Sequence, residues 1–150
     1  MKVRAKDYIY VITQLILLCL IVLEYNFWLF QIPQWMYFIS LFFIATGLLI
    51  CILALLQLSS ALSPFPSPKT GSMLVTTGLY NFIRHPMYTG LMVLTMGISL
   101  FRSSWFNFLI TLMLWLLLYF KSKYEEKLLM NTFSEYYDYM KKTGRFFPYF

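Results

Sequence analysis

The groups in this sequence that are best suited to chemistry gather in its second half. An Arg-His-Pro-Met-Tyr run occupies positions 84–88, directly before an apolar stretch, and two adjacent carboxylates, Glu125 and Glu126, follow the next apolar stretch. Ionisable groups beside apolar segments of this length are costly to bury and mark a functional site by default. If the two apolar stretches form a hairpin, cationic and anionic groups surround one cavity at its mouth. Such a cavity suits a zwitterionic polar ligand.

Each of these groups also has a simpler interpretation when it is taken alone. Arg84 could extend to lipid head groups, and His85 could cap a turn at the membrane surface. Lys121 and Glu125 stand four residues apart, the spacing of an ordinary helix-stabilising pair. Neighbouring helical residues point about 100° apart, so at most one of Glu125 and Glu126 can face a cavity, and the other is expected to face water. The combination of the two clusters, more than either alone, favours a site.

The composition requires a membrane around these groups. Of the 150 residues, 60% are hydrophobic and 12% are charged, against roughly 25% charged in soluble domains. The formal charge of +6 comes from basic residues beside apolar runs, which favours anionic lipid head groups over nucleic acid as partners. One histidine and two cysteines within apolar runs do not make a zinc site, so no metal is expected.

We expect an all-α, polytopic membrane protein with about four transmembrane helices, near residues 8–30, 35–58, 87–101 and 105–120. The third and fourth are short and closely joined, which predicts a helical hairpin. Apolar residues recur at helical spacing over 121–142, which predicts an amphipathic tail helix. The whole chain, 1–150, is interpreted as one membrane domain, with a two-span region at 1–62 and the chemistry-bearing region at 63–150. A proline-rich loop joins the two.

The basic residues predict the orientation. They lie before the first span, between the second and third, and after the fourth, whereas Arg102 alone falls on the opposite side. The positive-inside rule therefore places both termini in the cytoplasm. The brevity of the chain favours a bacterial plasma membrane. If the first two spans only build a lipid-facing wall, their residues will tolerate apolar exchange.

Four motifs together are familiar: Leu-Val-Thr-Thr-Gly-Leu-Tyr at 74–80, Arg-His-Pro-Met-Tyr-Thr-Gly at 84–90, Glu-Glu at 125–126, and Arg-Phe-Phe-Pro at 145–148. In this combination the chain resembles the isoprenylcysteine carboxyl methyltransferases and the related membrane phospholipid methyltransferases. The similarity covers roughly residues 64–150. The resemblance implies methyl transfer from S-adenosylmethionine at the membrane.

The resemblance also implies site residues. By motif position, the cofactor pocket is lined by Met73, Leu74, Val75, Tyr80, His85, Pro86, Met87, Tyr88 and the acidic contact Glu125. His85 suits the cofactor's carboxylate and Glu125 its ammonium or ribose, while the tyrosine rings suit adenine or the sulfonium. Lys121 and Arg84 are candidates for contacting the substrate.

Two departures from the family pattern bear on the acceptor and on the tail helix. Lys121 stands where isoprenylcysteine enzymes have an arginine that grips the substrate carboxylate, and a lysine supplies a point charge instead of a bidentate fork. Ser134 stands where relatives usually have glycine, which indicates a different course for the tail helix. The acceptor is therefore left open among an isoprenylcysteine-like carboxylate, a lipid amine and a small hydrophobic molecule.

Two other classes of protein remain alternatives. One is an NADPH-dependent membrane reductase of the sterol reductase type. The Glu-Glu pair and the lack of a further basic cluster for a 2′-phosphate argue against it. The other is a non-enzymatic membrane scaffold, which would leave the charged hairpin mouth unexplained.

Overall fold

The computed structural model describes residues 4–23, 28–58, 65–67 and 73–148. Its helices are α1 (Ala5–Val22), α2 (Gln34–Leu58), the short 3-10 helix η2 (Gly78–Asn81), α3 (Pro86–Arg102), α4 (Trp105–Thr132) and α5 (Tyr136–Lys142). The predicted all-α fold is confirmed. The boundary that we predict between residues 62 and 63, and most of the proline-rich loop, lie outside the described residues.

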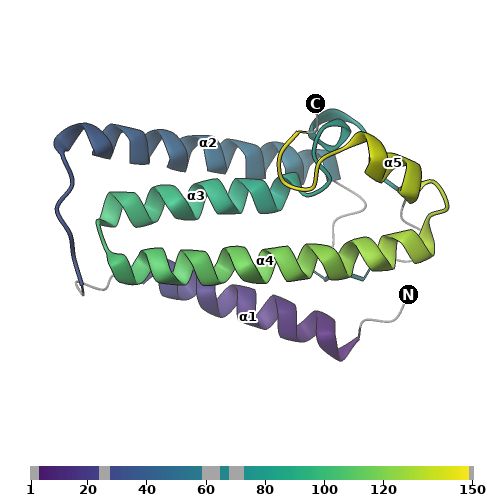
Figure 1. Cartoon of the computed structure of the whole chain (residues 1–150), viewed down its shortest axis with the longest axis horizontal. Helices are drawn as coiled ribbons and strands as arrows, with labels where there is room; N and C mark the ends of the chain where they lie inside the picture. The colour runs from purple at the N-terminus through teal and green to yellow at the C-terminus, as the bar shows by residue number, and fades with distance from the viewer. Residues whose placement is uncertain (1–3, 24–27, 59–64, 68–72, 149–150) are drawn as a thin grey trace.

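The four long helices lie side by side in the spatial order α2, α3, α4, α1 (Figure 1). Helix α3 packs against both α2 and α4, and α4 packs against α1. Helices α1 and α3 begin, and α2 and α4 end, at the side of the bundle where α5 lies (Figure 1). This side is called the α5 end below. The alternation of direction brings η2, the start of α3 and the end of α4 together there.

Three of the described helices, α1, α2 and α4, are long and apolar enough to cross a membrane. Helix α3 has 17 residues and lies between α2 and α4. A helix of 17 residues is about 26 Å long at 1.5 Å per residue, close to the thickness of the hydrocarbon layer. The interpretation as a polytopic membrane protein is confirmed, while a full crossing by α3 stays a prediction.

Two predicted boundaries differ from the structure. Helix α1 ends at Val22, well before residue 30. Helix α4 does not end near residue 120 but continues to Thr132, because the residues after the apolar run are good helix formers without glycine or proline. The expected tail helix at 121–142 is therefore split. Its first half extends α4, and its second half is α5, which begins at Tyr136 after a break.

Helices α2 and α3 approach each other at backbone distance. A Cβ atom on Gly47 would lie 2.4 Å from the backbone nitrogen of Leu94, and one on Gly97 would lie 2.7 Å from the backbone nitrogen of Ile44. Small residues at helix interfaces allow this approach. In membranes, van der Waals packing drives helix association, because the hydrophobic effect does not act between helices in lipid. The contact fixes α3 firmly against α2.

At the opposite end of the bundle, Arg102 connects α3 to α1. Its guanidinium donates hydrogen bonds to the backbone carbonyls of Ile21, Val22 and Leu23. These carbonyls belong to the last turn of α1, where the helix has no donors of its own to offer them. The last residue of α3 thereby caps α1.

Candidate active site

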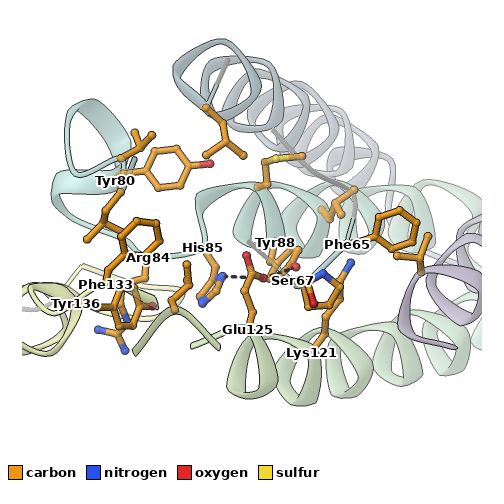
Figure 2. Close-up of a pocket in the computed structure, with 18 of the residues that line it drawn as sticks. Phe65, Ser67, Tyr80, Arg84, His85, Tyr88, Lys121, Glu125, Phe133 and Tyr136 are labelled. Carbon is orange, nitrogen blue, oxygen red and sulfur yellow. Dashed lines mark hydrogen bonds and ion pairs between the residues drawn. The ribbon is translucent and has the colours of Figure 1, made fainter. Parts of the chain in front are cut away.

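A cavity of about 270 Å³ lies towards the α5 end, between the middle of α1, the ends of α2 and α4, the start of α3, and α5 (Figure 2). The predicted site residues other than Pro86 line it, namely Met73, Leu74, Val75, Tyr80, Arg84, His85, Met87, Tyr88, Lys121 and Glu125. Pro86 is buried at the first position of α3 instead. There its fixed φ and missing N–H suit a helix start. The structure thus brings the two charged clusters together, while the role of each residue towards a ligand stays a prediction.

The residues after α5, 143–148, hold the start of α3 in place and are called the C-terminal segment below. The backbone N–H groups of Arg84 and His85 donate to the carbonyls of Gly144 and Arg145, at 2.8 and 3.1 Å. The Thr89 hydroxyl donates to the carbonyl of Phe146 at 2.8 Å. Backbone pairing of this kind fixes the position and the orientation of the chain before the helix. The C-terminal segment therefore helps to orient the side chains of His85 and Arg84.

Helix η2 is positioned by the end of α2. The backbone N–H of Leu79 donates to the side-chain oxygen of Gln57 at 2.8 Å. Gly78 before it has a φ of +62°, and a Cβ there would lie 2.5 Å from the same Gln57 oxygen. A residue with a side chain would be strained at this backbone angle and would have to displace the Gln57 amide. This turn places Tyr80 at the cavity.

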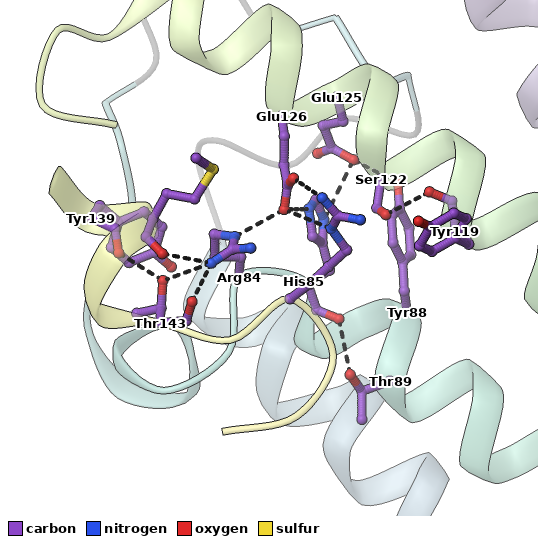
Figure 3. A network of polar contacts seen from close by, with 12 residues as sticks. Arg84, His85, Tyr88, Thr89, Tyr119, Ser122, Glu125, Glu126, Tyr139 and Thr143 are labelled. Carbon is purple, nitrogen blue, oxygen red and sulfur yellow. Dashed lines mark hydrogen bonds and ion pairs between the residues drawn. The ribbon is translucent and has the colours of Figure 1, made fainter. Parts of the chain in front are cut away.

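Glu126 is the centre of a buried ionic network (Figure 3). It is 3% exposed, and its Oε1 accepts from Arg84 Nε at 2.9 Å and from Arg145 Nε at 3.0 Å. The expectation that one of the two carboxylates faces water is wrong for Glu126. The helix direction that points it away from the cavity points it into the protein, because α5 and the C-terminal segment cover that face.

The Arg84 guanidinium is hydrogen bonded to Glu126 and to two backbone carbonyls. Besides Glu126, its guanidinium donates to the backbone carbonyls of Met140 and Thr143. Arg145 has the same carboxylate as a partner, and this hydrogen bond raises the pKa of its guanidinium. Arg84 lines the cavity, yet these bonds tie it to the C-terminal segment. Its suggested contact with a substrate stays a prediction.

Glu125 is the carboxylate that faces the cavity (Figure 2). Its Oε2 accepts a hydrogen bond of 2.7 Å from the Tyr88 hydroxyl and lies 3.7 Å from His85 Nδ1. The His85 ring stacks on the Tyr88 ring, with the planes 2° apart and the centroids 5.2 Å apart. His85 Nε2 lies 3.4 Å from Glu126 Oε1. The imidazole is thus held between the two carboxylates and against an aromatic ring.

Lys121 is the cationic group on the other side of Glu125. It is 3% exposed, and its Nζ donates to the Gln14 side-chain oxygen at 2.7 Å and lies 5.3 Å from the centre of the Tyr88 ring. Gln14 belongs to α1, as do the lining residues Val11 and Leu15. This wall of the cavity is not predicted above, although a glutamine within an apolar span indicates a polar partner.

Aromatic side chains surround the end of the cavity nearest α5. The Tyr139 hydroxyl donates to the backbone carbonyl of Tyr80 at 2.5 Å. Burial raises the pKa of Tyr139 to about 12, and burial together with the nearby Glu125 raises the pKa of Tyr80 well above its usual value. These side chains are therefore neutral at physiological pH. They offer hydroxyl groups and aromatic faces to a ligand without adding charge.

The site combines a carboxylate with electron-rich aromatic faces. A carboxylate and electron-rich aromatic faces attract ammonium and sulfonium centres. Within the described ranges, no three His, Cys, Asp or Glu side chains gather as a metal site would require. The polar groups stand next to the apolar side chains of helices that can span a membrane. The cavity can therefore receive a polar and an apolar molecule side by side.

Comparison with protein families gives one clear match. The family profile described as phospholipid methyltransferase matches residues 35–136. No curated protein sequence matches the chain significantly. The matched residues include η2, α3, α4 and the ionisable groups of the cavity, namely Arg84, His85, Lys121 and Glu125, but not α1. Since the match covers more than half of the sequence, the chain belongs to the phospholipid methyltransferase family.

Proposed function

We propose that this membrane methyltransferase uses S-adenosylmethionine as its methyl donor and methylates a lipophilic acceptor. The observation that carries the proposal is the position of Glu125. Its carboxylate faces the cavity, is held by the Tyr88 hydroxyl at 2.7 Å, and has the His85 ring beside it. A carboxylate fixed in this way can accept hydrogen bonds from an ammonium or from ribose hydroxyls.

The residues present fit such a donor. Glu125 would hold its ammonium or ribose, and His85 would meet its carboxylate. The rings of Tyr80 and Tyr88 would face adenine or the positively charged sulfur. When bound, S-adenosylmethionine supplies a methyl group that is already activated for attack. The protein then has to position the two reactants and to exclude water, which methyl transfer needs more than an acid or a base.

The acceptor side of the cavity borders the bilayer. Leu15 lines the cavity and is also 55% exposed, on a helix that is long and apolar enough to span the membrane. An apolar residue in this position forms the edge of an opening towards lipid. Leu91 of α3 continues the apolar lining. A lipophilic acceptor can therefore place its head group in the cavity while its chain remains among lipid tails.

The donor would reach the site from the cytoplasm. Most basic residues of the described chain lie at the α5 end or on the segments beside it, whereas Arg102 lies at the opposite end. The positive-inside rule places the more basic end in the cytoplasm. S-adenosylmethionine is charged and soluble in water, so the opening near Met73, which is 84% exposed, is the route we assign to it.

Calorimetry on the detergent-purified protein tests the proposal. We expect S-adenosylmethionine to bind the wild type, and Glu125→Gln to weaken binding at least about tenfold, since a charged hydrogen bond contributes roughly 1.5–3 kcal/mol. Asp138→Asn is the matched control, because that carboxylate lies on the exposed side of α5. A folded wild type that binds NADPH and not S-adenosylmethionine would overturn the proposal in favour of a reductase. Equal binding by wild type and Glu125→Gln would overturn the site.

A further inference from the structure

We propose that Lys123 and Arg145 bind the phosphate of an anionic phospholipid on the lipid-facing side of α4, at the α5 end. The two cations lie over the same aromatic ring. Lys123 Nζ is 5.0 Å from the centre of the Tyr119 ring, and Arg145 Cζ is 5.5 Å from it. Neither cation lines the cavity, so the inference does not depend on the methyl donor or the acceptor. Lys123, Arg145 and Tyr119 are called the phosphate site below.

One face of α4 changes from apolar to cationic at the phosphate site. Leu112, Leu116, Tyr119 and Lys123 follow one another at intervals of four, three and four residues, which places them on one side of the helix. All four side chains are exposed. Exposed apolar side chains on a helix that can span a membrane contact the acyl chains of lipids. A phospholipid whose chain lies along the two leucines therefore has its phosphate beside Lys123.

The depth of Lys123 agrees with the level of the lipid phosphates. Helix α4 begins at Trp105, whose exposed ring suits the membrane interface at the opposite end of the bundle. The helix from Trp105 to Lys123 is about 27 Å long at 1.5 Å per residue, and the hydrocarbon layer is about 30 Å thick. The Lys123 ammonium thus reaches the other edge of that layer. The positive-inside rule assigns this edge to the cytoplasmic leaflet, which carries anionic lipids.

The charges on this surface favour an anion. The Glu126 carboxylate is shared by Arg84 and Arg145, so one negative charge faces two positive ones. Glu125, the neighbouring carboxylate, faces the cavity. Among the described residues, no carboxylate forms an ion pair with Lys123, and its contact with the Tyr119 ring does not neutralise it. A phosphate has several acceptor oxygens, so it can bind a lysine and an arginine together.

A bound phosphate would also act on the C-terminal segment. Arg145 binds Glu126 through Nε and Nη2, two nitrogens on one edge of the planar guanidinium, so the remaining nitrogen, Nη1, is not used for Glu126. The backbone carbonyl of Arg145 accepts from the N–H of His85 at 3.1 Å. A lipid held by Lys123 and Arg145 therefore stabilises the pairing between the C-terminal segment and the start of α3.

Native mass spectrometry of the detergent-purified protein tests the binding. The probes are dioleoylphosphatidylglycerol and dioleoylphosphatidylcholine, which share their chains and differ in net charge. We expect the wild type to bind phosphatidylglycerol at least tenfold more tightly, and Lys123→Gln to reduce this ratio to within threefold. Lys123→Arg keeps the charge and should keep the preference. Lys142→Gln, the control, removes an exposed positive charge from α5 and should also keep it.

Hydrogen exchange tests the effect on the C-terminal segment and the source of the phosphate. Phosphatidylglycerol should slow the exchange of peptides that cover residues 82–90 at least threefold in the wild type and not in Lys123→Gln. Glycerol 3-phosphate, which has the phosphate without acyl chains, should not slow it. A wild type without the lipid preference, or a Lys123→Gln variant that retains it in full, would overturn the inference. Equal slowing by glycerol 3-phosphate would overturn the assignment to a lipid.

Discussion

The buried carboxylate of Glu126 holds the C-terminal segment on the site, and its removal gives the sharpest test of the structure. In Glu126→Gln, the side chain keeps its shape but loses its charge, so Arg84 and Arg145 share a neutral partner. Breaking a buried ion pair costs about 3–5 kcal/mol. The lower end applies here, because the Arg145 side chain is 25% exposed and water screens it in part. We therefore expect a loss of about 3 kcal/mol.

This loss falls first on the pairing between the C-terminal segment and the start of α3. The N–H groups of Arg84 and His85 donate to Gly144 and Arg145, so both become exposed when the segment detaches. A loss of about 3 kcal/mol is a factor of roughly 150 in the opening equilibrium. Hydrogen exchange of peptides that cover residues 82–90, followed by mass spectrometry, should be faster by about that factor in Glu126→Gln. Hydrogen exchange in the first half of α2, which lies away from the α5 end, should be unaffected.

The matched control is Glu135→Gln, which removes a carboxylate from an exposed position. It should leave the exchange of residues 82–90 unchanged. If Glu126→Gln accelerates exchange less than threefold, the ionic network does not hold the segment, and the reasoning above is refuted. If exchange accelerates equally over all helices, the variant has lost its fold as a whole, and the network stabilises more than the segment.

Three further predictions concern stability. Gly47→Leu should lower the thermal unfolding midpoint in detergent, since its Cβ would lie 2.4 Å from the backbone of Leu94 and overpacking costs about 1–3 kcal/mol. Ala45→Leu, on an exposed position of α2, is the control. An equal midpoint in both variants would contradict the close contact. Arg102→Met should lower the midpoint by removing the donors to the last carbonyls of α1, with faster hydrogen exchange at the end of α1 as its specific sign. The pKa of about 12 for Tyr139 lies above its value of about 10 in an unfolded chain. The folded state therefore keeps a proton that the unfolded state loses, so stability is complete below pH 10 and falls towards pH 12; Tyr139→Phe should show a smaller fall in the unfolding midpoint over that interval.

The bounds of α2 could be predicted to within one residue at its start, because an uncharged apolar run has one outcome in a membrane. The meeting of the Arg-His-Tyr run with the Glu-Glu pair could also be predicted, since a hairpin returns the chain to the same side. Hydropathy did not predict the end of α4. The end of a helix depends on the helix propensity of its residues and not on their hydropathy. The residues after Phe120 are polar but still favour helix.

Contacts between distant segments were beyond the sequence patterns. The sequence predicts only that one of the two adjacent carboxylates faces water. The burial of Glu126 could not be predicted, because it depends on α5 and on Arg145, which fold back over α4. The contribution of α1 to the cavity was missed for the same reason, since Gln14 and Lys121 are 107 positions apart. Periodicity describes one face of one helix, and it contains no information on which neighbour covers that face.

The glycine contact between α2 and α3 divides the bundle into a stiff half and a compliant half. Backbones that touch directly have no side chains between them to rotate aside, so α3 cannot move towards α2 without a clash. Among the four long helices, we therefore expect widening of the cavity for a bulky molecule to come from α4 and α1, whose contacts run through long side chains such as Leu17, Ile21, Leu114 and Leu118. The wall that carries His85 and Tyr88 then stays still while the wall that carries Gln14 and Lys121 moves. In the proposed function, the molecule would thus hold one reactant against a fixed surface and adjust its shape to the other.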